Sequence, residues 1–338
     1  MRRFLTMSRL QRPIHLVLDF DCTLTKHDSL HLLREIPLRR NARLGHYAIP
    51  VPEWSALERA YMEDYNRHQE ATAATKRELA RITSASAARS AYSQYLASRR
   101  VVELQSLQRA EAWGLFKGVT IDDVRGAAQA VIADGRLSMR EGWQQLLCSV
   151  RSASQSKASI ISVNWSASFI RECLLADLKQ HGQDREDLST MIERDLEIHA
   201  NDIDGLHEPH GSSGRMQSKV HTSADKLKYL PLSQGNNPDY PFRQADECNP
   251  YLIYVGDSST DFDALMAADT GIWLNPAENV EDAQRDCQQS FKPLQLTFYD
   301  LARSSGHIET PQGLAWANDF ESITDYVVRL ATSSRGPA

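Results

Sequence analysis

The stretch that decides the fold is Ile14–His15–Leu16–Val17–Leu18, followed directly by Asp19–Phe20–Asp21–Cys22–Thr23. A largely apolar run of this length, with the β-branched residues Ile14 and Val17, is typical of a buried strand. The run ends on two carboxylates, Asp19 and Asp21, which are separated by a single residue. Because residues i and i+2 share a face of an extended chain, these charges repel each other unless a cation or hydrogen bonds in the loop offset the repulsion.

A second stretch has the same design. Tyr251–Leu252–Ile253–Tyr254–Val255 is an apolar run that leads into Gly256 and Asp257, with Asp261 four residues further on. Two buried strands that end in carboxylates predict a cation site at the carboxyl edge of a parallel sheet, where open α/β sheets bind their ligands. Since the predicted ligands are oxygens, the sequence favours Mg²⁺ over Zn²⁺.

The composition narrows the class of protein. A chain of 338 residues exceeds the usual size of one domain, so we expect a large domain and a smaller one. The net charge of −6 argues against a nucleic-acid scaffold, and no apolar run is long enough to span a membrane. The five cysteines are scattered without a CxxC pair, which favours a reducing, cytoplasmic location. Four arginines and no acid in the first twelve residues leave a mitochondrial location as the alternative.

The chain divides into a helical part and an alternating part. Residues 27–137 have helical periodicity throughout, whereas strands and helices alternate from residue 158 onward. Alternation of this kind predicts a parallel sheet covered on both faces. The predicted organisation is a flexible extension over 1–13, a doubly wound α/β core over 14–26 and 138–332, an α-helical cap over 27–137 and a flexible tail over 333–338.

Local signals predict the individual elements. Thr120 is the expected N-cap of one helix, and Ser138–Glu141 has the pattern of a capping box that begins another. Turn residues around 204–214 predict a small β-hairpin. The other predicted elements are strands over 158–163, 196–200, 251–255 and 271–274, and helices over 53–82, 86–113, 166–179, 259–268, 278–289 and 319–332.

The predicted strand ends supply the parts that phosphoryl transfer needs. A carboxylate can attack a phosphoryl group, which splits one difficult displacement into two easier ones. A neighbouring acid can protonate the leaving alkoxide and later deprotonate water. A divalent cation and a lysine can neutralise the phosphate charge, and a hydroxyl group can hold its oxygens.

Four short motifs, in this order, resemble those of the haloacid dehalogenase (HAD) superfamily of aspartyl-phosphate enzymes. Asp19–Thr25 resembles the first motif, Ser162 the second, Lys226 the third, and Gly256–Asp257 with Asp261 the fourth. The resemblance covers residues 14–290 and implies a HAD-like core with bound Mg²⁺. An acid as the third residue of the first motif is found in the phosphatases and phosphomutases of that superfamily, so a phosphatase is the implied activity.

The resemblance also implies roles for individual residues. The expected catalytic residues are Asp19 as nucleophile and Asp21 as general acid and base. The expected metal ligands are Asp19, the backbone carbonyl of Asp21, Asp257 and Asp261. The expected phosphate-binding residues are Ser162, Lys226, Thr23, which also shapes its loop, and Asn164. Lys219 and Lys228 are alternatives to Lys226, and Ser166 is an alternative to Ser162, although Ser166 fits a helix N-cap better.

The substrate stays open within this resemblance. A helical insertion after the first motif resembles the cap of the phosphoserine phosphatase-like branch, and Ser162–Ser166 and Glu197–Asn201 resemble the HAD domain of plant thiamin-monophosphate phosphatases. Val163–Asn164 stands where phosphoserine phosphatases have two glycines, which argues against phosphoserine. We expect a small phosphorylated metabolite as the partner, with no nucleic acid and no membrane. The alternatives are a HAD phosphotransferase or mutase, and a catalytically idle HAD scaffold that binds or regulates a partner.

Overall fold

The fold is described from a computed structural model. The described residues are 12–181, 186–231, 250–275, 282, 285–286, 294, 296–303 and 313–332. Most of the expected N-terminal extension, the expected C-terminal tail and most of the helix expected over 278–289 lie outside these residues. None of the helices in the described part of the chain has the length and hydrophobicity needed to span a membrane.

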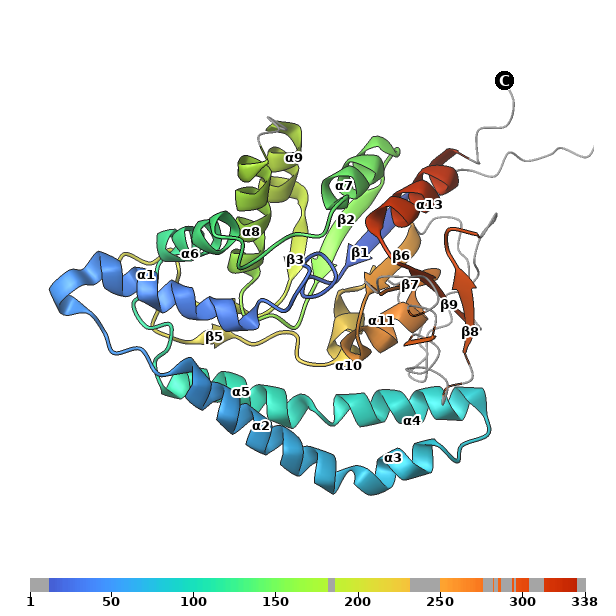
Figure 1. The fold of residues 1–338 in the computed structure, drawn as a ribbon, viewed down its shortest axis with the longest axis horizontal. Helices are drawn as coiled ribbons and strands as arrows, with labels where there is room; N and C mark the ends of the chain where they lie inside the picture. The colour runs from blue at the N-terminus through green and yellow to red at the C-terminus, as the bar shows by residue number, and fades with distance from the viewer. Residues whose placement is uncertain are drawn as a thin grey trace, which may run out of the picture.

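Within the described residues, seven parallel strands form one sheet (Figure 1). Its strand order is β3-β2-β1-β6-β7-β9-β8. The strands are β1 (Ile14–Leu18), β2 (Lys157–Ile161), β3 (Glu197–His199), β6 (Tyr251–Gly256), β7 (Thr270–Leu274), β8 (Thr297–Asp300) and β9 (Gly313–Ala317). The chain winds outward in both directions from the adjacent strands β1 and β6, which confirms the predicted doubly wound α/β class.

Between β1 and β2 the described chain is helical. Its helices are η1 (Leu30–Arg34), α1 (Glu35–Leu44), η2 (Gly45–Tyr47), α2 (Trp54–Ala71), α3 (Ala73–Leu79), α4 (Ala85–Ala97), α5 (Arg100–Ala112), α6 (Ile121–Ala133) and α7 (Trp143–Ser152). Helices α2 to α5 form a separate layer beside the sheet, whereas α1 and α6 lie near α8 (Figure 1). The division into core and cap at residues 27–137 stays a prediction, and these residues are called the helical insertion below.

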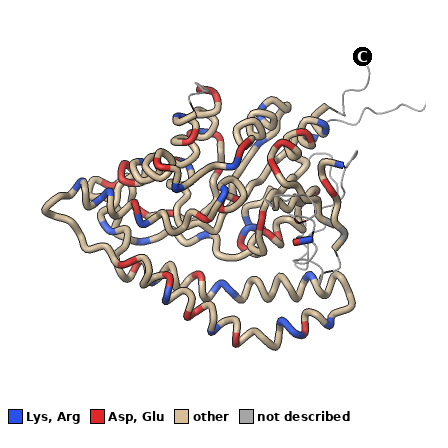
Figure 2. The backbone as a smooth tube through the Cα atoms, viewed as in Figure 1, with Lys and Arg blue, Asp and Glu red and all other residues tan. Residues whose placement is uncertain are grey.

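The remaining elements complete the two faces of the sheet. They are α8 (Ala167–Gln180), α9 (Glu186–Thr190), the π-helical turn Met191–Asp195, the hairpin β4 (Asp202–Ile203) with β5 (Met216–Gln217), α10 (Ser223–Lys226), η4 (Leu227–Tyr229), η5 (Ser259–Asp261), α11 (Phe262–Ala267) and α13 (Phe320–Thr332). The hairpin confirms the prediction made from the turn residues. Figure 2 shows that acidic and basic residues alternate along the backbone of both the insertion and the core.

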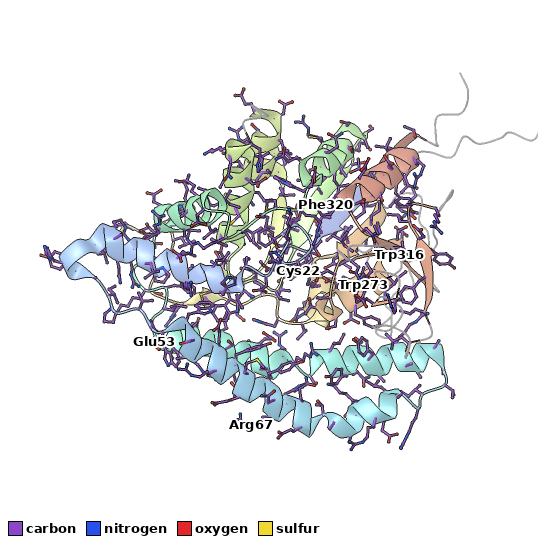
Figure 3. All side chains as sticks on the ribbon, viewed as in Figure 1. Cys22, Glu53, Arg67, Trp273, Trp316 and Phe320 are labelled. Atoms are coloured by element: carbon purple, nitrogen blue, oxygen red, sulfur yellow. The ribbon has the colours of Figure 1, made fainter. Side chains whose placement is uncertain are left out.

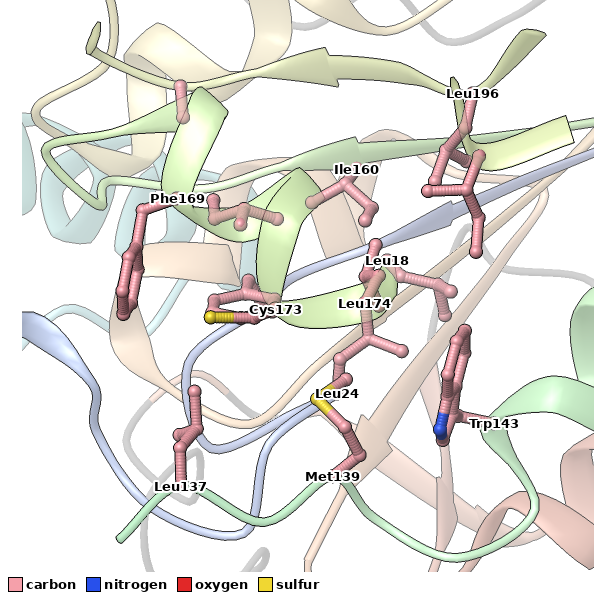
Figure 4. Close-up of a cluster of buried hydrophobic side chains, with 14 of the residues drawn as sticks. Leu18, Leu24, Leu137, Met139, Trp143, Ile160, Phe169, Cys173, Leu174 and Leu196 are labelled. Carbon is pink, nitrogen blue, oxygen red and sulfur yellow. The ribbon is translucent and has the colours of Figure 1, made fainter. Parts of the chain in front are cut away.

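Apolar side chains of the central strands pack on both faces of the sheet. Leu18 and Ile160 belong to the cluster around α7 and α8, together with Leu174 (Figure 4). Val17 and Tyr254 belong to a second cluster that includes side chains of α11 on the opposite face. Burial on both faces explains why these strands are continuous apolar runs rather than alternating ones.

Several predicted boundaries are confirmed by the caps that the sequence contains. The Thr120 hydroxyl accepts from the backbone N–H of Asp123, and the Asp123 carboxylate accepts from Thr120 in return, so α6 begins with a complete capping box. Ser166 accepts from the backbone N–H of Phe169 (3.0 Å) and caps α8, which is the structural role expected for it.

Other predicted boundaries are wrong, for reasons of tertiary pairing. The segment Ser138–Glu141 does not begin a helix, because Met139 forms a β-bridge with Thr25 and α7 starts only at Trp143. The predicted strand 158–163 ends at Ile161. The predicted helix 259–268 is divided into η5 and α11, and the predicted strands do not include the edge strand β8 or its neighbour β9.

Candidate active site

The two acid-bearing strand ends lie side by side. Strands β1 and β6 are neighbours, with Leu18 opposite Val255, and the backbone N–H of Asp19 donates to the carbonyl of Val255 (3.0 Å). One ligand oxygen from each of Asp19, Asp257 and Asp261 lies within 4.8 Å of the others. The winding of the sheet reverses between these two strands, so the cluster lies where doubly wound sheets bind their ligands.

The loop after β1 folds back on itself. The backbone N–H groups of Thr23, Leu24 and Thr25 all donate to the carbonyl of Phe20 (3.3, 2.8 and 3.0 Å). Cys22 has φ +58°, which places a residue other than glycine in the left-handed region. Figure 3 shows Cys22 near the centre of the molecule, between the sheet and the insertion layer.

Arg140 holds this loop in place from the segment before α7. Its guanidinium donates to the carbonyl of Cys22 (2.6 Å) and to the carbonyl of Thr23 (3.0 Å). Its backbone N–H also donates to the carbonyl of Leu24 (2.8 Å). The sequence analysis did not identify Arg140, because the bonds join residues more than a hundred positions apart and no motif marks them.

Lys226 is the cation of the cluster. It is fully buried, and its Nζ lies 3.0 Å from Asp19 Oδ2 and 2.6 Å from Asp261 Oδ1. Burial lowers the pKa of Lys226, but the charges of Asp19 and Asp261 outweigh burial and hold the pKa above its ordinary value. Tyr254 donates its hydroxyl to the same oxygen of Asp261 (2.6 Å), a contact that the sequence analysis missed. The nearby Lys228 pairs with Asp225 instead.

Asp21 is held by donors from two other segments. Its Oδ1 accepts from the backbone N–H (2.8 Å) and the hydroxyl (2.5 Å) of Ser29, and its Oδ2 accepts from the Asn164 side-chain amide (2.8 Å). Burial raises the pKa of Asp21, the charge of Asp28 adds to the rise, and these hydrogen bonds oppose it. The structure therefore places Asn164 against the expected general acid, and it adds Ser29, which the sequence analysis did not identify.

Two hydroxyl groups expected at the phosphate lie in the same region. Ser162 follows β2, is fully buried, and its hydroxyl accepts from the backbone N–H of Asn164 (3.2 Å). The Thr23 hydroxyl donates to Asp257 Oδ1 (2.9 Å), so it joins the loops after β1 and β6. The structure thus brings Ser162 and Thr23 to the carboxyl edge, while their contact with phosphate stays a prediction.

Asn201 connects the segment after β2 with the loop before α10. The sequence analysis did not assign it a role in the site. Its side-chain amide donates to the carbonyls of Asn164 (3.1 Å) and Val220 (2.8 Å). Its Oδ1 accepts from the backbone N–H groups of Lys219 (2.7 Å) and Val220 (3.0 Å). The backbone of Lys219 is therefore bound to Asn201, in the loop that leads to α10.

The carboxylates repel one another. Burial raises the pKa of Asp19 well above its ordinary value, and the charges of Asp261 and Asp257 add to the rise while Lys226 opposes it. Burial raises the pKa of Asp257 to about 7, and the charge of Asp261 makes the second-largest contribution to the rise. A set of crowded carboxylate oxygens with one lysine among them fits a hard divalent cation such as Mg²⁺. The part expected of the Asp21 carbonyl in binding it stays a prediction.

The raised pKa of Asp257 leads to a pH-dependent stability of the metal-free protein. Because the folded state binds this proton more tightly than the unfolded state, its contribution is present at low pH and is lost as the pH rises toward 7. We therefore expect the unfolding temperature in EDTA to fall between pH 5 and pH 8. Mg²⁺ should raise the unfolding temperature more at pH 8, where Mg²⁺ does not compete with the proton on Asp257. Equal effects of Mg²⁺ at both pH values would contradict this linkage.

Gly256 allows Asp261 to approach the end of β6. A Cβ atom at Gly256 would lie 2.3 Å from the Asp261 Cγ and 2.6 Å from its Oδ2. We expect Gly256→Ala to displace this carboxylate, to destabilise the fold by about 1–3 kcal/mol and to weaken Mg²⁺ binding. Gly126→Ala is the control, because Gly126 has no positive φ and an added Cβ would meet the flexible side chain of Arg39, with its Cδ at 3.7 Å. Chemical denaturation and Mg²⁺ titration of both variants would check this, and unchanged Mg²⁺ affinity in Gly256→Ala would count against it.

Comparison with known proteins shows distant likenesses. No protein-family model matches the chain. Cold tolerance protein 1 of Saccharomyces cerevisiae is 24% identical over 280 residues, which cover 78% of this chain and 80% of that protein. A CTO1 family protein of Schizosaccharomyces pombe is 25% identical over 276 residues, which cover 79% and 83%. A solved phosphoserine phosphohydrolase-like protein from Francisella tularensis matches at 13% identity with a TM-score of 0.39, over 92% of this chain and 98% of that one.

Proposed function

We propose that this chain is a HAD-type phosphatase, a magnesium-dependent phosphomonoesterase that hydrolyses a small phosphorylated metabolite. One observation carries the proposal. Asp19 Oδ2 lies 3.0 Å from Nζ of the buried Lys226, and a carboxylate oxygen of Asp19 lies within 4.8 Å of one oxygen each of Asp257 and Asp261. Folding gains nothing from such a crowd of carboxylates, because burying them is costly. The expected general acid, Asp21, belongs to the same loop as Asp19.

The residues of the chain account for both steps of the reaction. In the first step a carboxylate oxygen of Asp19 forms a bond to phosphorus while the bond from phosphorus to the leaving oxygen breaks. Protonated Asp21 gives its proton to that leaving oxygen, and its raised pKa favours the protonated form. In the second step Asp21 takes a proton from water, the water oxygen bonds to phosphorus, and the bond to Asp19 breaks.

Charge neutralisation comes from residues around the nucleophile. Lys226 opposes the rise in the pKa of Asp19 and so favours its ionised form, and with Ser162 it binds the oxygens of the transferring phosphoryl group. Asp19, Asp257 and Asp261 would hold Mg²⁺, and the short separation of their oxygens, within 4.8 Å of one another, supports this. Bound Mg²⁺ supplies positive charge that screens these carboxylates from the phosphate dianion. In this proposal the helical insertion acts as a cap that excludes water from the closed site.

The experiment that tests the proposal is a phosphate-release screen of the full chain with Mg²⁺ and with EDTA. The panel holds some tens of phosphorylated metabolites, including thiamin monophosphate, phosphoserine and pyridoxal phosphate. We expect release from some of them, only with Mg²⁺, together with trapping of the enzyme by beryllofluoride. Transfer of the phosphoryl group to an added alcohol in preference to water would favour the phosphotransferase instead. No release and no beryllofluoride binding, with Mg²⁺ shown to be bound, would favour the idle scaffold.

A further inference from the structure

The N-terminal end of α5 contacts two short helices that carry site residues. Arg99, the N-cap residue of α5, donates through Nη1 to the hydroxyl of Ser259 (3.5 Å) in η5. Arg100, the next residue, donates through Nη1 to Oδ2 of Asp225 in α10. Figure 1 shows the start of α5 below α10 in the same region. The helical insertion therefore touches the core where the third and fourth motifs lie.

An aromatic contact adds to this interface. The ring of Tyr92 in α4 packs edge-on against the ring of Phe262, with centroids 4.8 Å apart. Phe262 is the first residue of α11 and follows Asp261 directly. Helices α4 and α10 are also in contact. The insertion thus rests on α10, which ends at Lys226, and on α11, which begins directly after Asp261.

Asp225 links this interface to the phosphate-binding lysine. It is buried, and its Oδ2 accepts from the backbone N–H groups of His221 (3.2 Å) and Thr222 (3.3 Å), which fixes the first turn of α10. Its Oδ1 accepts from Lys228 (2.6 Å). Lys226 is the next residue of the same single-turn helix, so a shift of Asp225 moves the backbone from which Lys226 reaches the cluster.

We infer that Arg100 is a positioning residue for phosphoryl transfer, because its ion pair with Asp225 holds α10 and Lys226 in place when the helical insertion covers the site. The Arg100 side chain is 43% exposed and that of Asp225 is 4% exposed, so the arginine can leave when α5 moves away while Asp225 keeps its backbone donors. The inference rests on the proposed function. It adds that the contact between the helical insertion and α10 controls the position of Lys226 beside Asp19.

The test compares Arg100→Gln with Arg100→Lys and with a matched control. Arg125→Gln is the control, because Arg125 of α6 is 44% exposed and pairs with Glu172, whose side chain is 11% exposed, away from α10. The readouts are kcat/KM for a reactive aryl phosphate, the Kd of beryllofluoride in Mg²⁺ measured by calorimetry, and the unfolding temperature. We expect Arg100→Gln to lose roughly tenfold in kcat/KM and in beryllofluoride affinity, since small displacements of positioned groups are costly. Arg100→Lys should restore most of both, and Arg125→Gln should match the wild type.

The outcomes separate this inference from the proposed function. Wild-type protein that neither releases phosphate nor binds beryllofluoride would contradict the proposed function and the inference together. Active wild type with Arg100→Gln unchanged in both readouts would overturn the inference alone. Equal losses in Arg100→Gln and Arg125→Gln, or no recovery in Arg100→Lys, would also overturn it, because a general loss of stability would then explain the effect.

Discussion

Replacing Asp19 with Asn is expected to lower the rate of phosphate release by roughly 10⁴-fold or more, because loss of a nucleophile removes the covalent route altogether. The fold should tolerate the change. An asparagine side chain can still accept from the backbone N–H of Phe20, which donates to Asp19 Oδ1 (2.7 Å). Lys226 loses its ion pair with Asp19 but keeps the one with Asp261 (2.6 Å), so it is not left unpaired. The measurement is steady-state phosphate release from an aryl phosphate in Mg²⁺, beside the free energy of unfolding in EDTA.

A buried aspartate outside the cluster provides the control for this variant. Asp177 of α8 is buried and accepts from the indole N–H of Trp143 (3.0 Å), on the opposite side of the core from Lys226. Asp177→Asn should release phosphate at close to the wild-type rate. Activity in Asp19→Asn within tenfold of the wild type would show that another group is the nucleophile, and the proposed mechanism would then fail.

Much of the site was predictable from sequence because topology brings strand ends together. Asp19, Ser162 and Asp257 each follow a buried apolar run, and parallel strands deliver their carboxyl ends to one edge. Lys226 was harder to assign, since two other lysines lie nearby and only the folded chain shows which one reaches Asp19. The fold class followed from the alternation of strands and helices in the second half of the chain.

The contacts that orient these residues could not be predicted in the same way. Ser29, Arg140 and Tyr254 act on the site through side chains from separate segments, and their residue types are common in other roles. Nothing in local periodicity encodes such pairings. They depend on where the helical insertion and the strands lie relative to one another after folding.

The wrong element boundaries have the same origin. Ser138–Glu141 has the composition of a capping box, but pairing of Met139 with Thr25 keeps this segment extended. The sequence Gly313–Leu314–Ala315–Trp316–Ala317 has little β-propensity, because glycine and alanine are poor strand formers. It forms β9 because β7 and β8 pair with it on either side. Tertiary pairing therefore outweighs local preference at both places.

Replacing Lys226 with Met should combine a large loss of activity with a large loss of stability. Lys226 is fully buried between Asp19 and Asp261, so its removal leaves two buried carboxylates without their cation. Breaking such a pair costs about 3–5 kcal/mol in free energy of unfolding. Without the lysine the pKa of Asp19 should rise further, because Lys226 opposes the rise that burial causes. The folded state then takes up a proton, and the stability deficit shrinks as the pH falls from 8 to 5. Denaturant unfolding of the metal-free protein at these two pH values measures the effect.

Lys228 provides the matched control, because it is two residues away, its side chain is 62% exposed, and its partner Asp225 also pairs with Arg100. Lys228→Met should cost less than about 1 kcal/mol at either pH, because Asp225 keeps Arg100 and two backbone N–H donors as partners and the exposed ammonium is solvated in either state. The double variant Lys226→Met with Asp261→Asn should recover part of the stability lost by Lys226→Met, because it removes one of the two orphaned charges. Equal stability of the two single variants at pH 8 would mean that the carboxylates are neutral in the folded protein. The nucleophile would then lack the negative charge on which the proposed chemistry depends.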